Sequence, residues 1–332
     1  MKKANKLPIF TPFYSVYHEQ ANGTAILSKH DDAKNWYLNE CMNLRCDRHF
    51  LYSHTAPNVL ISRSSYKLNP FLKKEGFNTK YFGDSLHEVI HKLIDDEYYV
   101  VLEGVNEYFV NKGYNKKTQP LSADGLIYGY DDKKNIYNVL AYNRKQEYTN
   151  FNISQKCFSK ANKLAIENGE SGVLYGIKSD GQKHIFSPLL VIRHFAEYLN
   201  SSLEIFRPDI AEEAYGTVVH DYIGMYLDGL YDGSIFYKQQ NPNIFLVLSE
   251  QKRFMLERLI RLETELSMDN KISNEYSEIV KISEELINLY DSYCKMRQDN
   301  ILPIMKEKIL YMKQQEETLL REMIKNVKDI ML

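Results

Sequence analysis

The fold of this chain is decided by two neighbouring runs, GLIYGY (Gly125–Tyr130) and IYNVLAY (Ile136–Tyr142). Both runs are rich in β-branched and aromatic residues, which favour extended strands. The polar segment DDKKN (131–135) separates the two runs and is typical of a turn. We therefore predict that the two runs pair as an antiparallel hairpin.

More strands and two helices are expected around this hairpin. Residues 98–103 and 172–177 have the same strand-like composition. A helix is predicted from Ser85, because Ser85 and Glu88 fit a capping box. Its apolar face consists of Leu86, Val89, Ile90 and Leu93. An earlier helix is predicted over 36–44, with Asp31 or Asp32 as its cap.

The C-terminal half has a helical pattern. Ser187-Pro188 is typical of a helix start, and a further helix is expected over 209–230. Three long segments with heptad-like spacing follow, and Glu316 is the one polar interruption of the last apolar stripe. Short loops favour an antiparallel bundle. A homodimer through these C-terminal helices would bury the same stripes and remains an alternative.

These patterns predict the α+β class, with an α/β domain over 1–170 and a helical domain over 171–332. The composition narrows the function classes further. With 42 basic and 44 acidic side chains in 332 residues, nothing favours nucleic-acid binding. No long apolar window predicts a membrane helix, and four scattered cysteines are no disulfide framework. We expect a cytoplasmic protein, and no cofactor fingerprint is present.

One short motif suggests a metal site. His87 and His91 lie four residues apart on a predicted helix, so both could bind zinc while Glu88 acts as a general base. Lys92 follows the second histidine, and no third ligand follows at a suitable spacing. We interpret the two histidines as a solvated surface pair, and a zinc hydrolase through His87, Glu88 and His91 remains the less favoured alternative.

Cys41 is the second candidate. A cysteine near the start of a helix can become a thiolate, because the helix dipole stabilises its charge. Most single cysteines are instead small buried apolar residues. The spacing alone favours the structural role.

The hairpin carries a resemblance that raises the standing of Cys41. LSADGLIYGYDD (121–132), followed by residues 136–143, is similar to the central hairpin of bacterial papain-like domains. It resembles in particular the family of butirosin biosynthesis protein H, which is related to the peptidase domains of bacteriocin exporters. The helix over 35–44 resembles the region that carries the cysteine there. Residues 249–259 resemble the helical second half of relatives found beside natural-product gene clusters.

The resemblance implies a papain-like acyltransferase that forms an amide. Its cysteine would take an acyl group from an acyl or peptidyl carrier-protein thioester and pass it to an amine. Cys41 would be the nucleophile and Asn143 the orienting residue. The histidine base is expected at 123 or 124, where this chain has Ala123 and Asp124.

Three explanations fit the missing histidine. The protein is a non-catalytic binding or scaffold relative of the same fold, or the proton goes elsewhere, for instance to Asp124. The third explanation is an introduced histidine-to-alanine change at Ala123. One sequence does not separate the first explanation from the third.

Overall fold

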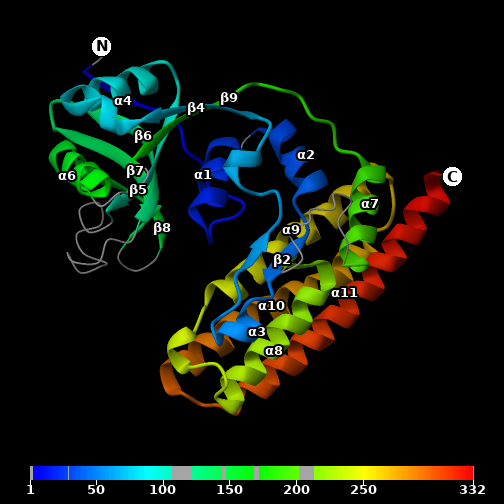
Figure 1. Ribbon diagram of the computed structural model, residues 1–332. Coiled ribbons are helices and arrows are strands. Elements are labelled where there is room, and N and C mark those ends of the chain that lie inside the picture. Colours follow the sequence, from blue (N-terminus) through cyan, green and yellow to red (C-terminus); the bar gives the residue numbers. More distant parts are fainter. Residues whose placement is uncertain are drawn as a thin grey trace. The chain divides into compact units, whose positions relative to one another are not determined.

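The computed structural model describes residues 3–28, 30–106, 122–143, 147–167, 172–201 and 213–331. The chain forms two compact units (Figure 1). Unit 1 comprises Met1–Ala33 and Ser64–Lys183, and unit 2 comprises Lys34–Arg63 and His184–Leu332. The segment 34–63, which the sequence placed with the N-terminal domain, therefore belongs with the C-terminal helices.

Unit 1 is built on an antiparallel sheet. Its strand order is β4-β9-β5-β6-β7-β8, and β1 pairs with the end of β6. The predicted hairpin is confirmed, because β6 and β7 pair antiparallel from Leu126 opposite Leu140 to Asp131 opposite Ile136. The strands are β1 (Ala4–Lys6), β4 (Leu72–Asn78), β5 (Tyr99–Asn106), β6 (Ser122–Asp131), β7 (Ile136–Tyr142), β8 (Tyr148–Ser154) and β9 (Val173–Ser179).

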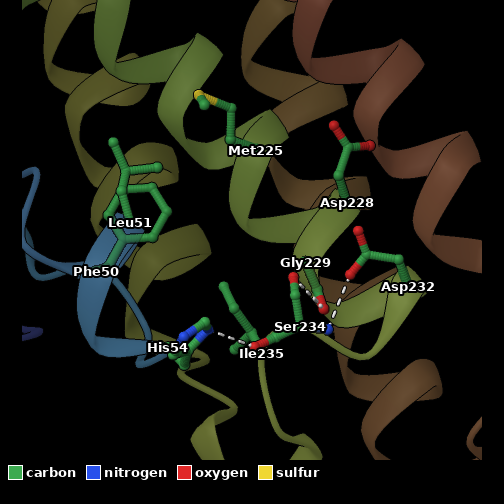
Figure 2. Close-up of a pocket in the computed structure, with 9 residues that line it drawn as sticks. All are labelled: Phe50, Leu51, His54, Met225, Asp228, Gly229, Asp232, Ser234 and Ile235. Carbon is green, nitrogen blue, oxygen red and sulfur yellow. Dashed lines mark hydrogen bonds between the residues drawn. The ribbon is translucent and has the colours of Figure 1, made fainter.

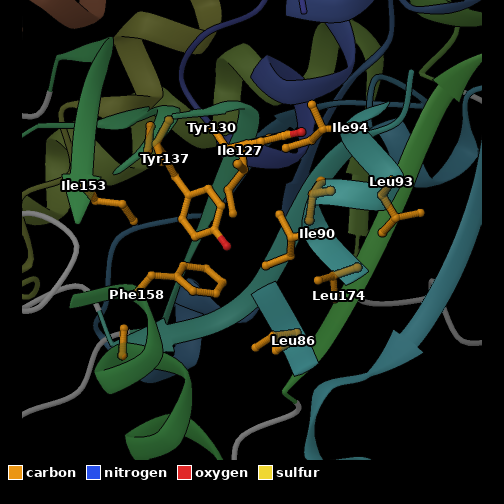
Figure 3. Packing of buried hydrophobic residues seen from close by; sticks show 14 residues of the cluster. Leu86, Ile90, Leu93, Ile94, Ile127, Tyr130, Tyr137, Ile153, Phe158 and Leu174 are labelled. Atoms are coloured by element: carbon orange, nitrogen blue, oxygen red, sulfur yellow. The ribbon is translucent and has the colours of Figure 1, made fainter. Parts of the chain in front are cut away.

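Two helices cover one side of this sheet. They are α4 (Leu86–Asp95) and α6 (Gln155–Glu167), and their apolar side chains share one core cluster with the strands (Figure 3). Ile90 and Leu93 come from α4, Phe158 comes from α6, and Ile127 and Leu174 come from the sheet. A third helix, α1 (His18–Leu27), contacts β6 within the same unit. The predicted helix after Ser85 is confirmed, although the Ser85 side chain does not cap it.

Unit 2 is mainly a helical bundle. α10 contacts both α9 and α11, and α11 also contacts α7 and α8 (Figure 1). A small sheet of order β10-β2-β3 completes the unit. The helices are α2 (Asp31–Glu40, whose first residues cluster with unit 1), α3 (Phe50–Ser53), α7 (Pro188–Leu199), α8 (Val219–Asp232), α9 (Asn243–Glu265), α10 (Lys271–Met296) and α11 (Ile301–Met331), and the strands are β2 (Leu44–Asp47), β3 (Val59–Ile61) and β10 (Glu213–Tyr215).

A buried ionic network lies inside this bundle. Glu316 on α11 accepts hydrogen bonds from Lys252 Nζ on α9 at 2.5 Å and from the Tyr198 hydroxyl on α7 at 2.9 Å. The Tyr276 hydroxyl on α10 also donates to Glu316. His220 Nε2 on α8 lies 3.7 Å from the same carboxylate. Burial alone would raise the pKa of Glu316, but the positive charge of Lys252 holds that pKa below its usual value.

Several predicted elements match the structure and others do not. The C-terminal helices and the antiparallel sheet confirm the α+β class. Ser187 caps α7 as expected, because its hydroxyl accepts a hydrogen bond from the Leu190 backbone at 3.4 Å. The helix expected over 209–230 begins only at Val219, and residues 209–212 lie outside the described part. Among the described residues, no helix is both long enough and apolar enough to cross a bilayer.

Candidate functional site

The structure places Cys41 at the wrong end of its helix for an activated thiol. α2 ends at Glu40, and the Cys41 backbone N–H still donates to the Tyr37 carbonyl at 3.0 Å. The expectation of an N-terminal position is therefore wrong, because α2 ends at Glu40 rather than at Leu44. The partial negative charge of a helix C-terminus disfavours a thiolate.

The surroundings of Cys41 also oppose ionisation. Its side chain is 0% exposed, and burial raises the pKa of the thiol, although the Arg258 charge acts in the opposite direction. The Arg258 guanidinium donates to the carbonyls of Leu38 at 2.6 Å, Tyr37 at 2.9 Å and Cys41 at 2.5 Å. These bonds satisfy the last carbonyls of α2, so Cys41 occupies a closed structural position.

The other residues implied by the resemblance lie in unit 1. Ala123 pairs with Val105 in the β5–β6 ladder, but the side chains of Ala123 and Asp124 lie outside the described part. Asn143 follows β7, and its side chain bonds the Glu147 carboxylate at 2.7 Å and the Glu147 backbone at 3.0 Å. The structure thus assigns Cys41 and Asn143 to different units.

The helix α1 also contacts β6 of the hairpin, and its first turn contains His18-Glu19-Gln20 without a cysteine. The His18 ring lies 4.6 Å from that of Tyr142, edge to face. Burial lowers the pKa of His18 to about 4, and its buried Nε2 has no hydrogen-bond partner among the described residues. In the sequence His18 is a single histidine, for which an ordinary structural or surface role suffices. Gln20–Leu27 are all buried, so α1 lacks the alternating polar face that reveals most helices.

The two histidines of the HEVIH motif (87–91) pack against neighbouring side chains. His87 Nδ1 lies 2.5 Å from the Tyr137 hydroxyl, and its Nε2 lies 2.7 Å from Ser159 Oγ. His91 is only 6% exposed and stacks on Tyr130 at 3.9 Å between ring centroids. The interpretation as a solvated surface pair is therefore wrong. Among the described residues, the structure holds no group of three or more His, Cys, Asp or Glu side chains suited to a metal ion.

A pocket in unit 2 is the strongest candidate site. Its volume is about 270 Å³, and it lies between α3 and the C-terminal end of α8 (Figure 2). Four lining residues are apolar and four are polar or acidic, which is a combination typical of ligand sites. The lining residues are Phe50, Leu51, His54, Met225, Asp228, Gly229, Asp232, Ser234 and Ile235.

The polar side of this pocket is held by local hydrogen bonds. His54 Nδ1 lies 2.9 Å from the Ser234 carbonyl oxygen, and Asp232 Oδ1 accepts the Ser234 backbone N–H at 2.8 Å. The His54 contact is with a carbonyl rather than with the Ser234 hydroxyl. His54 and Ser234 are therefore not arranged as a base and its nucleophile.

Exposed aromatic residues adjoin the pocket lining in the sequence. Tyr52 is 79% exposed, Tyr231 is 57% exposed and Phe236 is 69% exposed. Each directly precedes or follows a lining residue in the sequence. None of these three rings lines the pocket itself. The sequence analysis did not find this site, because its residues come from segments about 170 positions apart that show no common motif.

No protein-family model matches the chain, and no curated protein matches it.

Proposed function

We propose that this protein is a non-catalytic binding protein, rather than a cysteine acyltransferase, and that the pocket of unit 2 is its ligand site. The observation that carries the proposal is the position of Cys41. An acyl-enzyme needs a thiolate that an acyl group can reach. A buried thiol with a raised pKa at a helix C-terminus meets neither need.

On this proposal, the protein is a relative of the butirosin protein H family that binds a ligand but catalyses no acyl transfer. In the helix-and-hairpin order of papain-like domains the cysteine helix precedes the hairpin, and here α1 and α4 both precede the hairpin and contact β6. Neither helix contains a cysteine, and residues 123 and 124 are alanine and aspartate. The resemblance implied a carrier protein only as the donor of the acyl group. Without acyl transfer, we expect no carrier-protein partner.

The first experiment measures the alkylation of each cysteine in the native protein by iodoacetamide and mass spectrometry. Cys157 and Cys294 are only partly buried and serve as internal references. We expect Cys41 to react at least about a hundredfold more slowly than Cys157, because reaction requires local opening. In denaturant, the rates should converge.

The second experiment tests the chemistry directly. The protein is mixed with a short-chain N-acetylcysteamine thioester, which mimics a carrier-bound acyl group, and with an amine acceptor. We expect amide formation at the rate without protein, for the parent and for the matched variants Cys41→Ala and Cys157→Ala. Turnover that is lost in Cys41→Ala and kept in Cys157→Ala would overturn the proposal in favour of the acyltransferase.

A further inference from the structure

We propose that the pocket of unit 2 binds a small alkylamine in its protonated form. The ammonium group would lie against Asp228 and Asp232, and the alkyl part against Phe50 and Leu51. Figure 2 shows the two carboxylates on the α8 side of the pocket and the two apolar side chains on the α3 side. The inference rests on the proposed function, because it assigns a ligand class to the same pocket.

The acidic side of the pocket belongs to the last turns of α8. Asp228 and Asp232 lie four residues apart, so they share one face of the helix and repel each other. The C-terminus of a helix also carries a partial negative charge, where cations are favourable and anions are not. The last turn of α8 contains no basic residue. A bound cation would therefore be favourable beside these two carboxylates and the helix C-terminus.

Neighbouring groups neutralise this charge only in part. Lys306 Nζ lies 2.6 Å from Asp228 Oδ2, which balances one carboxylate. Asp232 instead accepts the backbone N–H of Ser234, and this hydrogen bond lowers the pKa of Asp232 below its usual value. The carboxylate of Asp232 is therefore ionised at neutral pH. Among the described residues, Lys306 is thus the lysine that pairs with this group of two carboxylates and a helix terminus.

The remaining lining selects an organic cation. Phe50, Leu51, Met225 and Ile235 offer apolar surface to an alkyl chain, which a hydrated metal ion could not use. The His54 bond to the Ser234 carbonyl requires a proton on Nδ1, so a neutral ring keeps Nε2 as an acceptor for an ammonium N–H. The volume of about 270 Å³ lies below the usual range of drug-sized sites, which favours a short chain.

The test compares three ligands with the same tail: hexylamine, hexanol and hexanoate. The methyl group of Met225 lines the pocket and is followed by NMR in protein labelled with ¹³C at the methionine methyls. Its resonance is assigned with Met225→Leu. At pH 7 we expect hexylamine to bind at least about fivefold more tightly than hexanol, and hexanoate to bind more weakly than either.

Asp232→Asn removes the charge and keeps an oxygen for the Ser234 N–H, so the turn should persist. This variant should weaken hexylamine binding about fivefold and leave hexanol binding unchanged. Asp269→Asn is the matched control, because Asp269 is exposed and follows the far end of α9. Equal effects of both variants on hexylamine would overturn the charge-based site.

The other outcomes separate this inference from the proposed function. Equal binding of hexanol and hexylamine would overturn the amine assignment and leave a ligand pocket in place. No shift of Met225 with any of the three ligands would overturn both the amine assignment and the choice of this pocket as the ligand site, whereas the absence of acyl transfer is decided by the Cys41 experiments. A lysine side chain offers the same ammonium chemistry. Binding of N-acetyl-lysine methylamide as tight as that of hexylamine would reassign the pocket to a protein partner.

Discussion

The two units of this protein have different interiors. The core of unit 1 joins apolar side chains of α4, α6 and the sheet, and the buried polar groups described in this unit are hydroxyl, amide and imidazole side chains, as at Thr79, Asn162 and His91. Every buried Lys, Arg and Glu side chain among the described residues belongs to unit 2. These residues are Glu197, Lys252, Arg258, Glu263 and Glu316.

This difference follows from how the strands of unit 1 and the helices of unit 2 select their packing neighbours. Strands in a sheet satisfy their backbone groups through the ladder, which also fixes the register. Helices satisfy their backbones internally, so apolar stripes alone allow several pairings. In unit 2, Glu316 receives hydrogen bonds from α7, α9 and α10 at one point. We infer that this network selects one arrangement of the bundle, at some cost in stability.

The largest expected effect comes from breaking this network. Glu316→Ala leaves the Lys252 ammonium buried without its counter-ion, which should lower the free energy of unfolding by about 3–5 kcal/mol. Trp36 is the single tryptophan and lies in unit 2, so its fluorescence during urea unfolding reports on this unit. Glu307→Ala, on the exposed side of the same helix, is the control and should change stability by less than about 0.5 kcal/mol.

A second variant separates specificity from stability. Lys252→Met combined with Glu316→Leu replaces the ion pair by apolar side chains and should recover most of the stability lost in Glu316→Ala. If the network only stabilises, the double variant should stay as unstable as Glu316→Ala. That result would contradict the role in specificity.

The sequence predicted the hairpin and the long helices because each depends on local periodicity. The strand pair β6–β7 and the helices α9, α10 and α11 all follow from apolar spacing and from the turns between them. Glu316 was visible as a polar interruption of an apolar stripe. Its partners were not, because Tyr198, Lys252 and Tyr276 come from other helices, and only packing brings them together.

The candidate site was predicted poorly for a related reason. The helix predicted over 36–44 runs instead over Asp31–Glu40, so Cys41 follows its last residue rather than lying near its start. Helix boundaries are the least certain part of any sequence pattern. The pocket joins α3 to the end of α8, so its chemistry depends on tertiary contacts that no local spacing records.

A second prediction compares the units through buried histidines. Burial lowers the pKa of His220 to about 3, whereas an unfolded histidine titrates near 6.5. Between these values the unfolded chain binds a proton that the folded chain does not. Stability should therefore fall as the pH falls from 6 to 4, by about 1.4 kcal/mol per pH unit from this group. His220→Gln should remove that part of the slope in Trp36-detected unfolding.

The control for this slope is His49→Gln, because His49 is exposed in the same unit. It should retain the pH dependence of the parent. His18 in unit 1, whose pKa burial lowers to about 4, should give unit 1 a similar acid sensitivity. Equal slopes in His220→Gln and the parent would show that His220 does not carry the acid sensitivity of unit 2.

The smallest expected effect is in unit 1, at the polar contact between Tyr137 and His87. Tyr137→Phe keeps the ring packed against Phe158 at 5.2 Å but removes the hydroxyl that contacts His87 Nδ1. Because His87 is only half-buried, water can replace the lost partner, and we expect a loss of about 1 kcal/mol. Hydrogen exchange of the β6 and β7 amides measures it, and the exposed Tyr81→Phe is the control. A loss as large as that of Glu316→Ala would mean that unit 1 also depends on a polar network, and the contrast between the two interiors would fail.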